Sequence, residues 1–101
     1  MNPHKIAALA SYYPNYLYRF YAKRPFLRQQ SFAEQQKTLF DDFFGWSDFL
    51  PRNFRKLGHQ ATQILANAEI LQRKWATEHR KSFPKNDWVL EITIAQLKEF
   101  V

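Results

Sequence analysis

The chain contains no cysteine, and only two glycines and five prolines occur among its 101 residues. The absence of cysteine excludes a disulfide framework, thiol catalysis and thiolate metal sites, and it fits a reducing compartment. So few glycines and prolines argue against a turn-rich all-β sandwich. Apolar residues make up 46% of the chain and aromatic residues 18%, so the composition is not that of a disordered segment. The length predicts one domain with one modest core.

Long hydrophobic runs are also missing. The opening segment MNPHKIAALASYYP holds only the apolar run IAALA, which is shorter than the roughly 7–15 apolar residues of a signal peptide. Nothing in the chain approaches the roughly 18 consecutive apolar residues of a membrane span. We therefore expect no targeting segment, no membrane span and a cytoplasmic protein.

The usual cofactor and metal motifs are absent from the sequence. No glycine-rich phosphate loop follows the first apolar run, and the three histidines have no metal-ligand spacing. Asp41 and Asp42 are adjacent on an expected helix and point about 100° apart, so we interpret them as part of a solvated face. The sequence predicts no catalytic residue, no metal site and no cofactor.

Acidic residues are missing from the first third of the chain, and the net charge is +6. The basic residues that precede the first acid, Glu34, are Lys5, Arg19, Lys23, Arg24 and Arg28. Such a segment is typical of a solvated surface, and it can also attract phosphates, nucleic acid or an anionic membrane face. Tyrosines interleaved with these cations make nucleic-acid binding a third hypothesis, but no binding motif supports it and we consider it unlikely.

The apolar periodicity and the capping residues predict two strands and several helices. Ser31 and Glu34 fit a capping box, and Gly45 and Gly58 supply helix ends. The expected strands are 5–10 and 59–68, and the expected helices are 14–24, 31–46, 47–58 and 68–81. Residues 88–101 alternate like a strand at some positions and repeat like a helix at others, and their length favours a helix.

Strands that alternate with helices predict a parallel sheet with a right-handed crossover. We expect an α/β fold: a partial Rossmann-like half with a minimal parallel sheet of about two strands and four to five helices. Because most sheets have about four to six strands, residues 1–101 form a single N-terminal subdomain that we expect to be incomplete without further chain or a partner.

Ligands of open parallel α/β sheets bind beyond the carboxyl ends of the strands. Five tyrosines gather in SYYPNYLYRFY, residues 11–21, and two of them lie at such an end. The candidate substrate-binding residues are Tyr12, Tyr13 and Asn15 after the first strand, and Asn67 and Glu69 after the second. The alternative is that Asn67 caps the next helix and the tyrosines fill the seam between helix and sheet. We assign Tyr16, Tyr18 and Tyr21 to packing.

Four segments carry a family resemblance: KIAALASYYPNYLYRFY, FAEQQKTLFDDFFGWSDF, KLGHQATQILANAEILQRKWA and DWVLEITIAQLKEF. In this order they resemble the N-terminal segment of bacterial two-Rossmann-domain glycosyltransferases, which include spore-maturation glycosyltransferase-like proteins. The resemblance implies a second domain that binds a nucleotide-sugar donor, while the present segment forms the wall for a sugar acceptor. It also implies that the segment is not active alone.

A second function class is compatible with the same residues. An unfinished sheet with exposed aromatic side chains is also typical of a non-catalytic interaction or oligomerisation module that binds a protein partner or forms a homo-oligomer.

Overall fold

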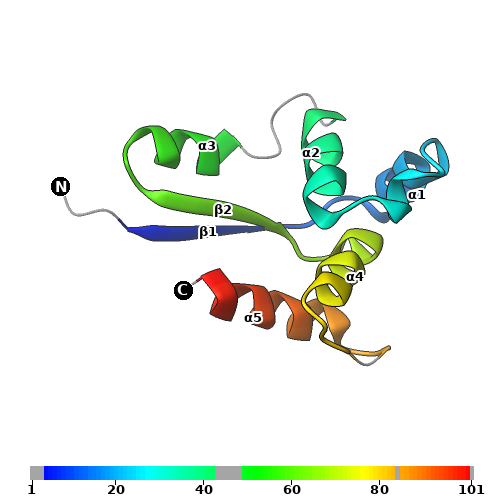
Figure 1. Cartoon of the computed structure of the whole chain (residues 1–101). Helices are drawn as coiled ribbons and strands as arrows, with labels where there is room; N and C mark the ends of the chain where they lie inside the picture. Colours follow the sequence, from blue (N-terminus) through cyan, green and yellow to red (C-terminus); the bar gives the residue numbers. More distant parts are fainter. Residues whose placement is uncertain (1–3, 43–48, 84, 101) are drawn as a thin grey trace.

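The computed structural model describes residues 4–42, 49–83 and 85–100, and Figure 1 shows how their elements are arranged. The elements are β1 (Lys5–Ala10), α1 (Pro14–Ala22), the 3₁₀ helix η1 (Leu27–Gln29), α2 (Phe32–Asp42), α3 (Phe49–Lys56), β2 (Gln60–Leu65), α4 (Glu69–Glu78) and α5 (Trp88–Phe100). The predicted α/β class is confirmed: the described residues are mostly helical and contain a two-stranded parallel sheet. The expected helix end at Gly45 and helix start at Ser47 lie outside the described residues.

The two strands run parallel and in register, from Lys5 opposite Gln60 to Ala10 opposite Leu65. Helix α3 packs against both strands, and Figure 1 shows α3 and α5 on opposite sides of the sheet. At the amino ends of the strands, the His4 backbone N–H donates to Nδ1 of His59 at 3.0 Å, and the two rings stack with their centroids 5.4 Å apart. His59 therefore joins the two strand starts.

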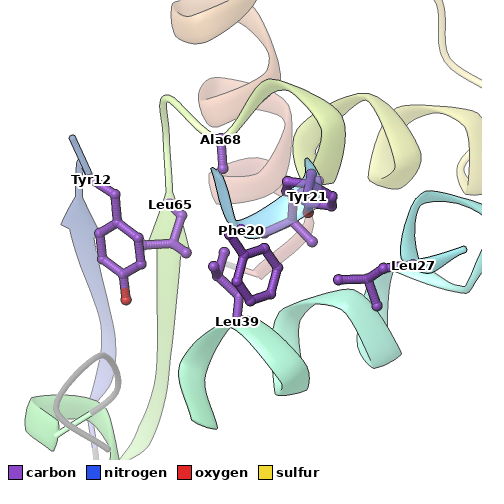
Figure 2. Close-up of a cluster of buried hydrophobic side chains, with 8 residues drawn as sticks. Tyr12, Phe20, Tyr21, Leu27, Leu39, Leu65 and Ala68 are labelled. Carbon is purple, nitrogen blue, oxygen red and sulfur yellow. The ribbon is translucent and has the colours of Figure 1, made fainter. Parts of the chain in front are cut away.

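The main core lies between the carboxyl half of the sheet and helices α1, α2 and α4. Its buried members are Tyr12, Phe20, Tyr21, Leu27, Leu39, Leu65, Ala68 and Leu71, and Figure 2 labels all of them except Leu71. A smaller cluster of Trp75, Ala76 and Ile92 joins α4 to α5. The core therefore concentrates at the end of the sheet where ligands are expected.

Helix α2 begins as the capping pattern predicts, because the Glu34 backbone N–H donates to Oγ of Ser31 at 3.1 Å. The apolar pattern missed one buried member of this helix, Gln35. Its amide oxygen accepts the Tyr21 hydroxyl at 3.0 Å, and its amide nitrogen donates to the Gln30 carbonyl at 2.9 Å. Gln35 can be buried because protein groups replace the hydrogen bonds that its amide would make with water.

The ambiguous segment 88–101 forms a helix over its described residues, Trp88–Phe100, as its length predicts. Trp88, Ile92 and Ala95 lie one helical turn apart and contact the α4 cluster. Among the described residues, every helix is too short or too polar to cross a lipid bilayer.

Arg80, two residues beyond the end of α4, adopts the left-handed conformation, at φ 55°. The Lys81 N–H donates to the Ala76 carbonyl at 2.9 Å and the Arg80 N–H donates to the Thr77 carbonyl at 3.1 Å, the bonds of a Schellman-type helix end. We expect Arg80→Gly to raise the free energy of unfolding by about 0.5–1 kcal/mol, because glycine adopts this conformation without a Cβ clash. Urea denaturation measures the change. Arg80→Ala removes the same side chain but keeps Cβ, so an equal gain in that control would contradict the explanation.

Candidate functional site

The carboxyl ends of β1 and β2 lie next to each other at one end of the sheet. The Ala66 N–H donates to the Ala10 carbonyl at 2.9 Å, one residue beyond the last pair of the ladder. Helix α1 begins at Pro14 and helix α4 begins at Glu69, so both helices start beside these strand ends. This arrangement places the chain segments 11–15 and 66–70 next to each other, as the parallel topology predicts.

Asn67 joins the two strand ends with both ends of its amide. Its Oδ1 accepts the Tyr12 N–H at 3.0 Å, and its Nδ2 donates to the Tyr12 carbonyl at 2.6 Å. The residue at the start of α4 is Ala68, and its side chain cannot cap the helix. Asn67 therefore positions the site by holding the first strand end against the second, and the alternative reading of Asn67 as a helix cap is wrong.

The candidate residues on the first strand end point in different directions. Tyr12 is 9% exposed and lies in the main core, where Figure 2 shows its ring beside Leu65. Tyr13 is 82% exposed, and Asn15 is also exposed. Tyr12 therefore supports the floor beneath the strand end, whereas Tyr13 and Asn15 face solvent.

A cavity of about 270 Å³ lies between α1 and the start of α4, just beyond the end of β2. It is lined by Pro14, Leu17, Tyr18, Tyr21, Asn67, Ala68, Glu69 and Ile70. Two of the five candidate residues, Asn67 and Glu69, belong to this lining. Most of the remaining lining is apolar, so the cavity combines an apolar wall with a few polar groups, as small-molecule sites do.

Tyr18 was assigned to packing, and that assignment is wrong because its side chain is 78% exposed at the rim of this cavity. A signal for it is present in the sequence. Pro14, Leu17, Tyr18 and Tyr21 follow the spacing of one helix face. This face lines the cavity, and it lies beside the face that carries Phe20 into the core.

The polar groups of the cavity differ in their freedom to bind a ligand. Burial raises the pKa of Tyr21, and its hydroxyl already donates to Gln35, so this phenol stays neutral and occupied. The Glu69 side chain is 55% exposed, and Nε of Arg73 lies 3.3 Å from its Oε2. An exposed pair of this kind contributes little to stability, so the Glu69 carboxylate can accept hydrogen bonds from a ligand at small cost.

A second polar cluster fixes the opposite side of α1. The Tyr16 hydroxyl donates to Asp42 Oδ2 at 2.5 Å, and Arg24 Nη2 lies 2.9 Å from Asp42 Oδ1. Burial, and then the hydrogen bond to Asp42, raise the pKa of Tyr16. The Arg24 guanidinium also lies 4.1 Å from the centre of the Phe20 ring. Asp42 thus anchors α1 to α2 and is more than part of a solvated face.

Other hollows of the surface fit a ligand less well. One of them, of about 630 Å³, lies beside α5 and is lined by Lys81, Ser82, Phe83, Glu91, Ile94, Ala95, Lys98 and Glu99. Long charged side chains dominate that rim, and no strand end opens into it. Within the described ranges, no three histidine or acidic side chains come together as a metal site would need. The strand-end cavity is therefore the better candidate site.

Comparison of this chain with protein-family models, with curated proteins and with solved structures found no match.

Proposed function

We propose that this chain is the acceptor-side segment of a glycosyltransferase-like protein, and that the strand-end cavity holds a hydroxyl-rich acceptor such as a sugar. The observation that carries the proposal is the composition of the cavity rim. An exposed aromatic ring, Tyr18, lines the same cavity as a carboxylate, Glu69, and an amide, Asn67, beside the carboxyl ends of two parallel strands.

Each of these groups suits a part of a sugar. The flat apolar face of a tyrosine packs against the C–H face of a pyranose ring, and its hydroxyl remains in water. The Glu69 carboxylate accepts hydrogen bonds from sugar hydroxyls, which are charge-assisted and therefore stronger than neutral bonds. The Asn67 amide is committed to Tyr12, so its role is to hold the wall in place.

In the proposed reaction, this chain orients the acceptor hydroxyl, and a separate donor-binding domain supplies the nucleotide-sugar. Holding two reactants in a productive geometry is itself a large part of group-transfer catalysis. The resemblance to two-Rossmann-domain glycosyltransferases supports this division between acceptor side and donor side. On this proposal the chain binds an acceptor but transfers no sugar by itself.

We expect mono- and disaccharides to shift the backbone NMR signals of residues 14–18 and 67–70 when they are titrated into the labelled chain. Tyr18→Ala and Glu69→Gln should each weaken binding about tenfold, because the first removes the ring contact and the second removes the charge that strengthens the hydrogen bonds to the sugar. The Glu69 variant should fold normally, since the exposed pair with Arg73 contributes at most about 0.5 kcal/mol.

Tyr13→Ala is the matched control, because Tyr13 is as exposed as Tyr18 but lies outside the cavity lining. Its binding should equal that of the parent chain. The absence of sugar-induced shifts, or an equal loss in Tyr13→Ala, would count against the proposed acceptor site. Sugar transfer by the isolated chain from a nucleotide donor would contradict the division into two sides.

A further inference from the structure

The carbonyl groups along the outer edge of β2 have partners within the chain. The Gln60 N–H donates to the His4 carbonyl and the Ala66 N–H donates to the Ala10 carbonyl, so the even-numbered residues of β2 face β1. The backbone groups of the odd-numbered residues face away from β1, and all three of their carbonyls have partners, since the Leu65 carbonyl accepts the Ala68 N–H at 3.2 Å. Arg55 Nη1 donates to the Ala61 carbonyl at 2.8 Å, and Gln36 Nε2 donates to the Gln63 carbonyl at 3.3 Å.

The outer edge of β1 has a different character. Because the carbonyls of His4 and Ala10 face β2, the backbone groups of Ala7 and Leu9 face away from it. Across residues 4–42, 49–83 and 85–100, no backbone or side-chain group bonds to these outward N–H and C=O groups. The Leu9 side chain is 57% exposed, and Figure 1 shows β1 at the border of the sheet. An edge of this kind is a template for another strand.

We propose that the outer edge of β1 pairs with β1 of a second copy of this chain, in antiparallel orientation. This is an interaction surface separate from the sugar site proposed above. An antiparallel pair about a two-fold axis places Ala7 opposite Leu9 of the second copy and Leu9 opposite its Ala7. Since both residues face outward, these two pairs form about four N–H···O=C bonds.

Three properties of the edge favour a second copy as its occupant. The pattern of donors and acceptors is complementary to itself when the strand is reversed. Self-pairing joins two strands from each copy into a four-stranded sheet, which is within the usual range of about four to six. The only charged residue of β1, Lys5, lies roughly 20 Å from its own copy in this register, at about 3.4 Å per residue, so the positive charges stay apart.

Ala7→Pro tests the edge directly. Proline at this position removes only an N–H that faces outward, so the ladder with β2 is kept while the outer edge is blocked. In sedimentation velocity over a range of concentrations, we expect the parent chain to reach twice its 12.2 kDa mass. The Ala7→Pro variant should associate at least about tenfold more weakly, because the dimer loses the bonds made by two N–H groups. Its circular dichroism spectrum should match that of the parent.

Ala7→Val is the matched control, because it changes the side chain but keeps the N–H, and it should dimerise like the parent. A parent chain that stays monomeric at millimolar concentration would overturn the proposal, as would a folded Ala7→Pro variant that still dimerises. Amide hydrogen exchange provides a test that requires no variant. The N–H groups of Ala7 and Leu9 should gain at least about tenfold protection at high concentration, and unchanged exchange would overturn the proposal.

Discussion

The Gln96→Leu variant is expected to unfold about 2–4 kcal/mol more easily than the parent chain, because it leaves the amide of Gln72 buried without a partner. Gln72 on α4 and Gln96 on α5 exchange two hydrogen bonds of 2.8 Å, each donating to the amide oxygen of the other. Both side chains are buried. Each polar group stranded in this environment costs about 1–3 kcal/mol, and the single variant strands two.

The double variant Gln72→Leu/Gln96→Leu should recover most of the lost stability and come within about 1 kcal/mol of the parent. Leucine is close to glutamine in size, and the two leucines bury apolar surface where α4 packs on α5. Urea denaturation of the parent, the single variants and the double variant forms a complete cycle. Gln29→Leu, at an exposed glutamine, is the control and should change stability by no more than about 0.5 kcal/mol. A double variant as unstable as the single one would contradict the pairing.

The same pair explains why residues 88–101 are ambiguous as a sequence. Trp88, Leu90, Ile92 and Ile94 alternate as in a strand, but the structure buries Ile92 and Gln96, which lie one helical turn apart. Apolar periodicity counts glutamine as polar, so it does not predict that Gln96 belongs to the buried face of α5. The bonds to Gln72 lie 24 residues away in the sequence, and only tertiary structure reveals them.

Local signals predicted the elements well where the cause is itself local. The Ser31 cap and the first strand, 5–10, follow from neighbouring residues, whereas the second strand, expected over 59–68, ends at Leu65. The role of each tyrosine does not. Tyr12 is buried and Tyr13 exposed because successive side chains near a strand end point to opposite sides, and the choice of the buried side depends on where α1 and α2 pack. Tyr18 lies at the cavity because of where α1 packs, which the local sequence does not determine either.

Asn67 illustrates the limit of residue type as a guide to the site. An asparagine before a helix is typical of a cap or of a ligand contact, and both readings are compatible with the sequence. The structure shows a third use, because the amide mimics a peptide group and pairs with the backbone of Tyr12, 55 residues earlier. A bond across that separation requires the two strands to be in register, which no local pattern encodes.

We expect Asn67→Ala to lower the free energy of unfolding by about 2–3 kcal/mol. The variant loses two hydrogen bonds worth about 1 kcal/mol each, and it leaves the N–H and C=O of Tyr12 with poorer partners. Because Tyr12 belongs to the main core, loosening its backbone also disturbs the packing against Leu65. Urea denaturation measures the loss, and amide exchange at Tyr12 should accelerate more than exchange in α5.

Two further variants separate the effect of the two Asn67–Tyr12 hydrogen bonds, called the clasp below, from a general effect of losing an asparagine. Asn67→Asp keeps an acceptor for the Tyr12 N–H but places a carboxylate oxygen against the Tyr12 carbonyl, so it should lose at least as much stability as Asn67→Ala. Asn15→Ala removes an exposed asparagine on the other strand end and should change stability by no more than about 0.5 kcal/mol. Equal stability of Asn67→Ala and Asn15→Ala would mean that the two strand ends hold together without the clasp. The cavity wall would then depend on core packing alone, and saccharide binding would survive the loss of Asn67.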